Sequence, residues 1–281
     1  MFLDKANRET VELPDSLLDE FAANCRAALK KQFSDKRNEN FTIRMSNIGR
    51  PLCTLQMEQA GTPAEVPSTF HKMKMLMGDL IENAAIAIMR ASGVNIEAVS
   101  QPVSLDIAGI TIQGTYDVKI DGRIYDIKSA SPYSFSHKFA EGSFPQLLAD
   151  DSFGYVAQGF GYAEADKSPF GGWIAVDKVS GEWSVSLVPD GTEYEVARRN
   201  ALDKISQNVS ALTSNVPFAR CFEDVPETYY KKSTGNKVLG FNCEYCAFKQ
   251  ACWPDMKVMS DLNSKGQSPK IKYYTHIEKG N

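Results

Sequence analysis

The most constraining feature of this sequence is a change in the period of its apolar residues. In residues 15–33 and 71–91 these residues recur at helical spacing. In residues 110–128 they alternate as in strands, and Asp121-Gly122 within this stretch is typical of a tight hairpin turn. The predicted hairpin strands span residues 110–119 and 123–128. A chain of this kind must combine helices with a β-sheet.

The two periods alternate again in the second half of the chain. Helices are predicted at residues 150–165 and 193–213, and strands at 172–176 and 183–187. Glycines within the first of these helices weaken its prediction, because glycine is a poor helix former. Residues 34–70 are mostly polar and are predicted to be irregular. The Lys-rich tail from residue 255 is predicted to be loosely ordered.

This order of elements predicts an α/β fold, with a central mixed sheet flanked by helices. We expect a single domain over residues 1–281. Its predicted parts are an N-terminal helical part (1–45), a core (46–215), a segment rich in cysteine (216–254) and a polar tail (255–281).

Composition and charge set limits on function. The chain has 281 residues, of which 43% are hydrophobic and 23% are charged, as in ordinary globular proteins. Its formal net charge of −4 is unlike that of a protein that coats nucleic acid nonspecifically, although a local basic groove could still bind phosphates. No apolar run approaches the roughly 20 residues that a membrane span needs. The first residues show no secretory pattern, so we expect a cytoplasmic protein with no membrane partner.

Three chemically active residues lie on the predicted hairpin. Side chains alternate between the two faces of a strand, so Asp126 and Lys128 share one face. Folding the hairpin can bring Asp117 beside Asp126. Two adjacent carboxylates repel each other unless a cation lies between them, and Mg²⁺ or Mn²⁺ suits oxygen ligands. The alternative is an ordinary surface hairpin with solvated charges.

These residues resemble the motifs of the PD-(D/E)XK nuclease superfamily, in particular its RecB-like branch. Asp117 matches the first acid of the motif, and Asp126-Ile127-Lys128 matches the (D/E)XK element. In such a site a metal ion polarises the phosphodiester and acidifies a bound water. Lys128 would orient or deprotonate that water, or offset charge that builds on the phosphate.

Two further motifs of that branch occur in the expected order. Upstream, Gly78 and Glu82 match a helix motif of the G-x-x-x-(H/E) type, and downstream Gln158 and Tyr162 match a Q-x-x-x-Y motif. Taken singly, Glu82 could be an exposed helix residue, Gln158 a surface amide and Tyr162 a core aromatic. The resemblance covers roughly residues 46–254, most of the chain.

The resemblance implies a Mg²⁺- or Mn²⁺-dependent deoxyribonuclease, in particular an exonuclease that acts on DNA ends or single strands in replication, recombination or repair. The implied metal ligands are Glu82, Asp117, Asp126 and the Ile127 carbonyl, and the implied DNA contacts are Gln158 and Tyr162. Unwinding would require a helicase or recombination partner, because the chain has no phosphate-binding loop of the motor type. The size fits a phage or mobile-element enzyme, and hence a bacterial or phage-infected cell. The rival interpretation is a noncatalytic module that binds DNA ends or a partner protein.

Three cysteines near the C-terminus have the spacing of metal ligands. Cys243, Cys246 and Cys252 form a C-x₂-C-x₅-C pattern, and a closed four-ligand site needs one more cysteine. Cys53 is the best candidate. Four thiolates suit zinc and iron–sulfur clusters equally well by their softness.

The resemblance to the RecB-like branch favours an iron–sulfur cluster over zinc at these cysteines. The iron–sulfur members of that branch, which include AddB-type recombination nucleases and the nucleases of CRISPR spacer acquisition, carry one cysteine before the nuclease core and three behind it. The resemblance therefore implies a [4Fe–4S] cluster at the C-terminal end of the fold, ligated by Cys53, Cys243, Cys246 and Cys252, with Zn²⁺ as the alternative. Cys25 lies on a helical apolar stripe and is predicted to be a core residue. Cys221 is predicted to be structural, with a role as substitute for Cys53 left open.

Overall fold

The computed structural model describes residues 6, 8–34, 41–66, 68–262 and 270–278 of the chain. It divides into two compact units. The sheet unit consists of Met1–Gly49 and Pro67–Thr213, and the C-terminal unit consists of Arg50–Val66 and Ser214–Asn281. The single domain expected from the sequence stays a prediction. None of the described helices is long and apolar enough to span a membrane.

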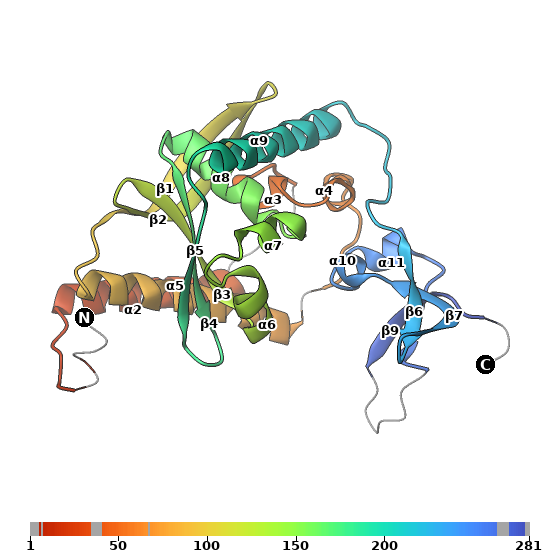
Figure 1. Cartoon of the computed structure of the whole chain (residues 1–281), viewed down its shortest axis with the longest axis horizontal. Coiled ribbons are helices and arrows are strands. Elements are labelled where there is room, and N and C mark those ends of the chain that lie inside the picture. The colour runs from red at the N-terminus through yellow and green to blue at the C-terminus, as the bar shows by residue number, and fades with distance from the viewer. Residues whose placement is uncertain (1–5, 7, 35–40, 67, 263–269, 279–281) are drawn as a thin grey trace. The chain divides into compact units, whose positions relative to one another are not determined.

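The sheet unit alternates helices and strands in an order close to the predicted one (Figure 1). Its elements are α2 (Asp15–Phe33), α3 (Met45–Ile48), α5 (Thr69–Ala91), β1 (Ile96–Ile107), β2 (Ile110–Ile120), β3 (Arg123–Ala130), α6 (Pro132–Lys138), α7 (Phe144–Ala149), α8 (Tyr155–Asp166), β4 (Phe170–Asp177), β5 (Trp183–Leu187) and α9 (Thr192–Thr213).

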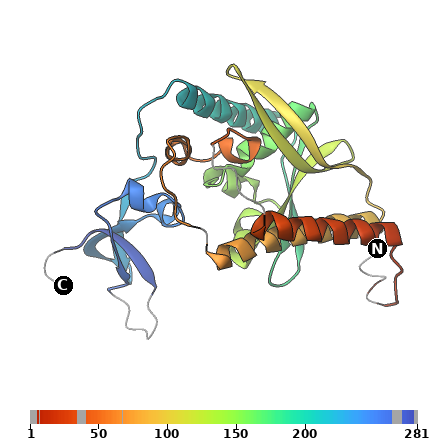
Figure 2. The ribbon, with the colours of Figure 1, turned by 180° about the vertical axis from the view of Figure 1, so that it is seen from behind.

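The five strands form a sheet in the order β1-β2-β3-β4-β5. Only β3 and β4 are parallel, and the connection between them carries α6, α7 and α8. The predicted α/β fold with a mixed sheet flanked by helices is therefore confirmed. The predicted hairpin turn is confirmed as well, since Asp121 and Gly122 have φ values of 46° and 72°. In Figure 2, β1 and β2 form a long ribbon that continues beyond the short stretch where β2 pairs with β3.

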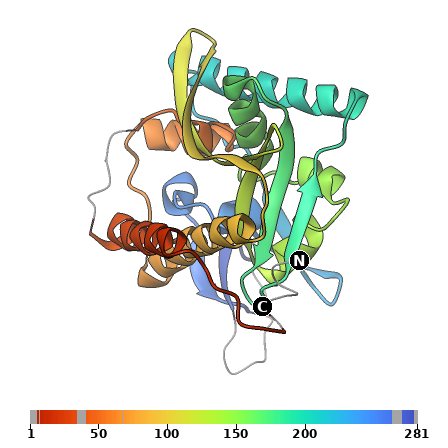
Figure 3. The ribbon, with the colours of Figure 1, turned by 90° about the vertical axis from the view of Figure 1, so that its left-hand side faces the viewer.

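Helix α5 covers one face of the central strands. Three of its residues pack with residues of β2, β3 and β4 in one core cluster of Ala85, Ile86, Met89, Val118, Ile127, Ile174 and Val176. Helix α2 runs beside α5 (Figure 3), where Lys31 and Gln32 both donate to the carboxylate of Asp79. Cys25, predicted to be a core residue, is only half-buried on α2.

Helix α8 forms despite its glycines because tertiary packing requires them. Gly154 precedes the helix at φ 77°, where a left-handed residue is needed. The carboxylate of Asp151 accepts from the first backbone N–H groups of the helix, those of Tyr155 and Val156, at 2.7 and 2.9 Å. Gly159 lies on the Phe170 ring, whose Cζ would be 2.2 Å from an added Cβ.

The C-terminal unit is built on an antiparallel sheet in the order β6-β7-β9-β8. Its elements are α4 (Leu52–Gln59), β6 (Asp224–Tyr229), β7 (Lys232–Leu239), α10 (Phe241–Glu244), α11 (Lys249–Cys252), β8 (Lys257–Ser260) and β9 (Ile271–His276).

Two expectations about irregular segments are wrong. The tail was expected to be loosely ordered, yet it contributes β8 and β9, and Tyr274 of β9 is buried. Residues 263–269 of the tail lie outside the described residues. The stretch 34–70 contains α3 and α4, whose Met45, Ile48 and Leu55 are fully buried. A few well-placed apolar side chains are sufficient to fix such short elements against the rest of a fold.

Candidate functional site

The candidate site begins where β2 and β3 separate. Their antiparallel pairing brings Val118 opposite Tyr125 and would bring Asp117 opposite Asp126, but the ladder ends at Val118. Beyond this point the Asp117 carboxylate accepts the Ile127 backbone N–H, at 2.6 Å. The Asp117 side chain thus takes the place of a main-chain acceptor in the ladder. Its hydrogen bond with Ile127 fixes the Asp117 carboxylate against β3.

Strand alternation then points the chemically active side chains to one face. Val118 and Ile127 both pack in the core beneath α5. Asp117, Asp126 and Lys128 alternate with them and therefore point to the opposite face of the strands. The sequence predicted this placement of the two acids and the lysine, and the structure brings them together. Glu82 lies on α5, which covers the other face of these strands, and its charge acts on Asp117. We call Glu82, Asp117, Asp126 and Lys128 the acid patch.

The acid patch is crowded with negative charge. Burial, together with the charges of Asp126 and Asp79, raises the pKa of Glu82 on α5 to about 7. Burial and the charges of Asp126 and Glu82 raise the pKa of Asp117 well above its usual range. Burial also raises the pKa of Asp126, and the charge of Lys128 opposes that shift. Burial of three carboxylates, two of which also have their pKa values raised by the charge of Asp126 or Glu82, forms a site that attracts a cation.

Lys128 supplies part of the missing positive charge. Its Nζ lies 2.6 Å from Asp126 Oδ2 and 4.8 Å from the centre of the Tyr155 ring. Burial lowers the pKa of Lys128, but Asp126 and Asp117 outweigh it and the net pKa is raised, so the side chain is cationic at neutral pH. Despite this ion pair, no donor among the described residues approaches Asp126 Oδ2 with hydrogen-bonding geometry.

The oxygen donors of the acid patch fit Mg²⁺ or Mn²⁺ in kind. Asp126 is buried, whereas Glu82 and Asp117 are half-buried. The Ile127 carbonyl points to the same edge of β3 as the Ile127 N–H, toward Asp117. No three His, Cys, Asp or Glu side chains in the described ranges are placed closely enough to hold a metal ion as they stand. The Lys128 ammonium group lies 2.6 Å from Asp126 Oδ2, an oxygen that a metal ion would use.

Gln158 and Tyr162 lie one turn apart on α8, as their spacing predicted. Gln158 Nε2 donates to the Tyr162 hydroxyl at 3.1 Å. Tyr162 is buried, and burial is the main cause that raises its pKa to about 12, with further contributions from the charges of Asp126 and Asp117. Its ring lies on Gly114, where an added Cβ would be 2.6 Å from Tyr162 Cε1. Tyr162 is therefore a core aromatic whose hydroxyl holds Gln158 near the acid patch.

Sequence reasoning missed two residues that support the acid patch. Tyr155 places its ring against Lys128, and Asp151, four residues before the first residue of α8, caps the start of that helix. The signal for Asp151 was present, because an aspartate shortly before an apolar helical run is a common cap. Nothing in the local sequence marks Tyr155, since its partner Lys128 is distant along the chain.

Five of the six cysteines belong to the C-terminal unit, and they influence one another. The Cys53 backbone N–H donates to Cys221 Sγ at 3.1 Å, and the Phe248 N–H donates to Cys246 Sγ at 3.4 Å. Hydrogen bonding to Cys221 and burial raise the pKa of the Cys53 thiol, and charge on Cys246 raises it further. The four predicted ligands thus lie in one region of one unit, with Cys221 among them. The soft donor set fits an iron–sulfur cluster or Zn²⁺ in kind.

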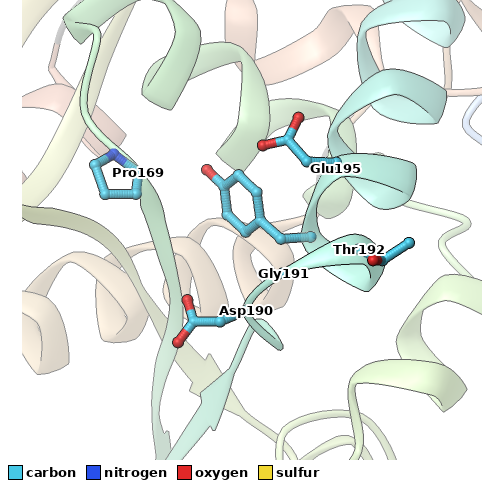
Figure 4. Close-up of a pocket in the computed structure, with 6 residues that line it drawn as sticks. Pro169, Asp190, Gly191, Thr192 and Glu195 are labelled. Atoms are coloured by element: carbon cyan, nitrogen blue, oxygen red, sulfur yellow. The ribbon is translucent and has the colours of Figure 1, made fainter.

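A separate surface hollow lies at the start of α9 (Figure 4). It is lined by Pro169, Asp190, Gly191, Thr192, Tyr194 and Glu195. None of the site residues predicted from the sequence lines it. The Tyr194 hydroxyl accepts the Phe170 N–H at 2.9 Å, so at least this polar group serves the fold.

Comparisons with known proteins do not assign a family. No family model matches the chain, and no curated protein matches it at a significant level. Among solved structures, the crystal structure of a protein named SSO0001 is similar over 84% of this chain and 96% of that chain, with a TM-score of 0.46 and 14% sequence identity. So distant a likeness carries no functional inference, and function has to be inferred from the residues of this chain.

Proposed function

We propose that the chain is a metal-dependent DNA nuclease whose active site is the acid patch. One observation carries this proposal: burial raises the carboxylate pKa values of Glu82, Asp117 and Asp126, the charge of Asp126 raises the first two further, and the half-buried ammonium group of Lys128 lies beside Asp126. A fold does not maintain several poorly compensated carboxylates without a reason, because each costs free energy when it is ionised. Phosphodiester hydrolysis supplies a reason, since it uses metal-bound carboxylates and a lysine.

The residues divide the work by their chemistry. Glu82, Asp117 and Asp126 would hold one or two Mg²⁺ or Mn²⁺ ions with the Ile127 carbonyl, and the bound metal would polarise the phosphodiester and acidify a water. Lys128 remains protonated beside Asp126, so its natural part is to orient that water and to offset charge that builds on the phosphate. Tyr155 keeps the ammonium group of Lys128 in place through its ring.

DNA is the proposed partner, bound near α8. Gln158 is held by the Tyr162 hydroxyl through its amide nitrogen, which leaves its carbonyl oxygen available to the substrate. The resemblance favours exonuclease action on ends or single strands during replication, recombination or repair. A helicase or recombination protein would then supply unwinding.

We propose further that the C-terminal unit carries a structural [4Fe–4S] cluster, with Zn²⁺ as the alternative, on Cys53, Cys243, Cys246 and Cys252. The cysteines come from two segments that are distant in sequence, Arg50–Val66 and Ser214–Asn281, yet form one compact unit. A centre bonded to both segments would close a long loop and stabilise the unit by restricting the unfolded chain. Intact protein with absorbance near 400 nm, iron and acid-labile sulfide would support the cluster over zinc.

The nuclease proposal is tested by the degradation of end-labelled single- and double-stranded linear DNA in Mn²⁺ or Mg²⁺. Asp126→Asn keeps the shape of the side chain and removes its charge, and we expect it to lower the rate by at least about 100-fold. Asp203→Asn is the matched control, because Asp203 is exposed on α9 and outside the acid patch. It should cut at the wild-type rate.

Each outcome of this experiment has a clear meaning. Cutting by the wild type and the control but not by Asp126→Asn supports the metal-nuclease site, and the product ladder would reveal polarity. Absence of cutting by folded wild-type protein contradicts the catalytic proposal and favours the noncatalytic DNA-binding module. Equal cutting by all three proteins would indicate a contaminating nuclease or a different active site.

A further inference from the structure

The cysteine region contains one thiol more than a four-ligand centre uses. Cys53, Cys221, Cys243, Cys246 and Cys252 all lie in the C-terminal unit. The resemblance assigns no role to Cys221, and the sequence left open whether it substitutes for Cys53. The structure, however, places it in direct contact with the cysteine that was expected to be the upstream ligand.

Both neighbours of Cys221 in the chain are anchored to the C-terminal cysteine segment. Arg220 donates to the Cys252 carbonyl from Nη2 at 2.7 Å and from Nε at 3.2 Å, and its guanidinium group lies 3.9 Å from the centre of the Trp253 ring. Phe222 packs in the apolar cluster that contains Cys243, Cys252 and Trp253. Cys221 lies between these two anchors, so its backbone is held close to the segment that carries the later cysteines.

The contact with Cys53 has the form found around metal-bound sulfur. A backbone N–H, that of Cys53, donates to Cys221 Sγ at 3.1 Å. Hydrogen bonds of this kind stabilise thiolates and tune metal centres. Cys246, one of the three C-terminal ligands proposed above, also receives a backbone N–H, from Phe248 at 3.4 Å. In this respect Cys221 resembles a ligand more closely than a structural thiol.

A buried donor points independently to an acceptor in this region. The Trp253 indole is only 9% exposed, and its Nε1 has no hydrogen-bond partner among the residues that the structure describes. The indole packs in the same apolar cluster as Cys243, one of the proposed ligands. An unpaired buried N–H costs free energy, and a thiolate or sulfide in a bound centre would satisfy it.

We infer that Cys53 and Cys221 share one ligand position of the proposed cysteine centre, and that either thiol can complete the set formed by Cys243, Cys246 and Cys252. This inference rests on the proposed centre, but not on nuclease activity or on the choice between iron and zinc. Serine at position 53 leaves the Cys53 main-chain N–H in place, so the hydrogen bond to Cys221 survives that substitution. Likewise, loss of the Cys221 thiol leaves Cys53 in the same unit as the three later cysteines.

The test measures metal and sulfide per chain in full-length protein purified without oxygen. Cys53→Ser and Cys221→Ser should each retain at least about half of the wild-type metal, whereas the double variant should retain about a tenth or less, as expected for a site that loses its fourth ligand. Cys25→Ser is the matched control, because Cys25 lies on α2 in the sheet unit, and it should keep the full content. DNA cleavage is recorded separately, so failure of the nuclease proposal is distinguishable.

Other patterns overturn the inference. If Cys53→Ser alone empties the centre while Cys221→Ser is full, Cys221 is a bystander. The reverse pattern makes Cys221 the sole upstream ligand. Wild-type protein without bound metal removes the centre and the inference together.

A second measurement does not depend on the folding of any variant. Native wild-type protein is alkylated briefly and digested, and the labelled cysteines are identified by mass spectrometry. A shared position predicts that both peptides carry label and that the labelled fractions of Cys53 and Cys221 together do not exceed about one label per chain. Label confined to one of the two thiols, or nearly complete labelling of both, contradicts the inference.

Discussion

Two buried carboxylate sites in this molecule have opposite electrostatics. In the acid patch, burial and mutual repulsion raise the pKa values of Glu82 and Asp117. In the C-terminal unit, Glu227 has a side chain only 1% exposed, yet its pKa is lowered to about 2, because its hydrogen bonds to Lys272, Asn236, Thr234 and Tyr274 outweigh the effect of burial. Burial therefore does not by itself identify a functional acid.

The difference lies in the number of donors that each carboxylate receives. Four side chains donate to Glu227, with Lys272 and Tyr274 on one oxygen and Asn236 and Thr234 on the other. In the acid patch three carboxylates share one lysine, and Asp126 Oδ2 has an ion pair without hydrogen-bonding geometry. The carboxylate of Glu227 has all its donors without a ligand, whereas the acid patch has capacity for a further cation. Removal of a carboxylate charge should therefore have opposite effects on stability in the two sites.

The largest effect is expected when the acid patch loses its lysine. Lys128→Met removes the cation nearest to Asp126 and should lower the free energy of unfolding at pH 8 by about 3 kcal/mol, because breaking a buried pair leaves a charge uncompensated. The loss should shrink at pH 5, where raised pKa values allow the carboxylates to accept protons. DNA cleavage should fall by at least about 100-fold.

Urea unfolding at the two pH values measures the change in stability. Lys119→Met is the matched control, because Lys119 pairs with Asp166 nearer the surface, at 21% and 17% side-chain exposure, and should cost about 1 kcal/mol or less. Equal losses in the two variants would show that the acid patch carries no unusual charge.

The protein should be destabilised when Glu227, whose carboxylate has four donors, loses its charge. Glu227→Gln keeps the shape of the side chain but weakens its bond with the Lys272 ammonium and places an amide NH₂ against other donors. Since the folded pKa of Glu227 is lowered to about 2, its contribution is complete above the unfolded pKa of about 4.3 and is lost as the pH falls through about 2. We expect the variant to lose about 2 to 3 kcal/mol at pH 7 and to match the wild type near pH 2.

Denaturant titrations of the wild type and Glu227→Gln across this pH range provide the measurement. Hydrogen exchange would locate the loss, which should concentrate in β6, β7 and β9, the strands that Glu227 and its partners occupy. A difference between the two proteins that persists unchanged at pH 2 would contradict a charge-based role for Glu227.

The same polar network explains why the sequence did not reveal the C-terminal sheet. Its strands are held partly by buried polar side chains, so the apolar alternation that identifies a half-buried strand is weak in them. The hairpin of β2 and β3 was readable because its apolar residues alternate and its turn residues are specific to one turn type. Strands were therefore predicted correctly from the sequence where the alternation of apolar residues matches the burial of the strand in the fold.

Within the candidate sites, the same distinction holds. Strand alternation and helix spacing are local rules, so the neighbourhood of Asp117, Asp126 and Lys128 could be predicted. Cys221 could not be ranked against Cys53, because its position depends on the contact of Arg220 with Cys252, which joins segments distant in sequence. Spacing can identify a set of candidate ligands, but tertiary anchoring decides which thiols meet.

In the acid patch, removal of the Glu82 charge should stabilise the metal-free protein. The folded pKa of Glu82 is raised to about 7, so its contribution to stability is complete below the unfolded pKa of about 4.3 and declines until the pH passes about 7. At pH 8 the ionised side chain is a constant cost, and Glu82→Gln should raise the free energy of unfolding by about 2 kcal/mol.

Thermal unfolding of the wild type and Glu82→Gln, each with chelator and then with Mn²⁺, separates the two parts of this prediction. The variant should melt higher in chelator, and Mn²⁺ should raise the melting temperature of the wild type more than that of the variant, because the ion binds the folded form. A lower melting temperature for Glu82→Gln in chelator would mean that Glu82 is as well satisfied as Glu227.

The smallest expected effect concerns the backbone beside Glu82. Gly78 lies one turn before Glu82 within α5, and an added Cβ there would meet no heavy atom of the described residues within 4 Å. Glycine inside a helix costs about 0.5 to 1 kcal/mol relative to alanine, so Gly78→Ala should stabilise the protein by that amount. The protein's own packing thus gives no reason for glycine at this position, and approach of a substrate to the helix would give one.

Measurements of DNA affinity and melting temperature for Gly78→Ala test this explanation directly. Higher stability with weaker DNA binding indicates that substrate passes over this turn of α5 on its way to the acid patch, whereas higher stability with unchanged binding limits the DNA contact to other elements.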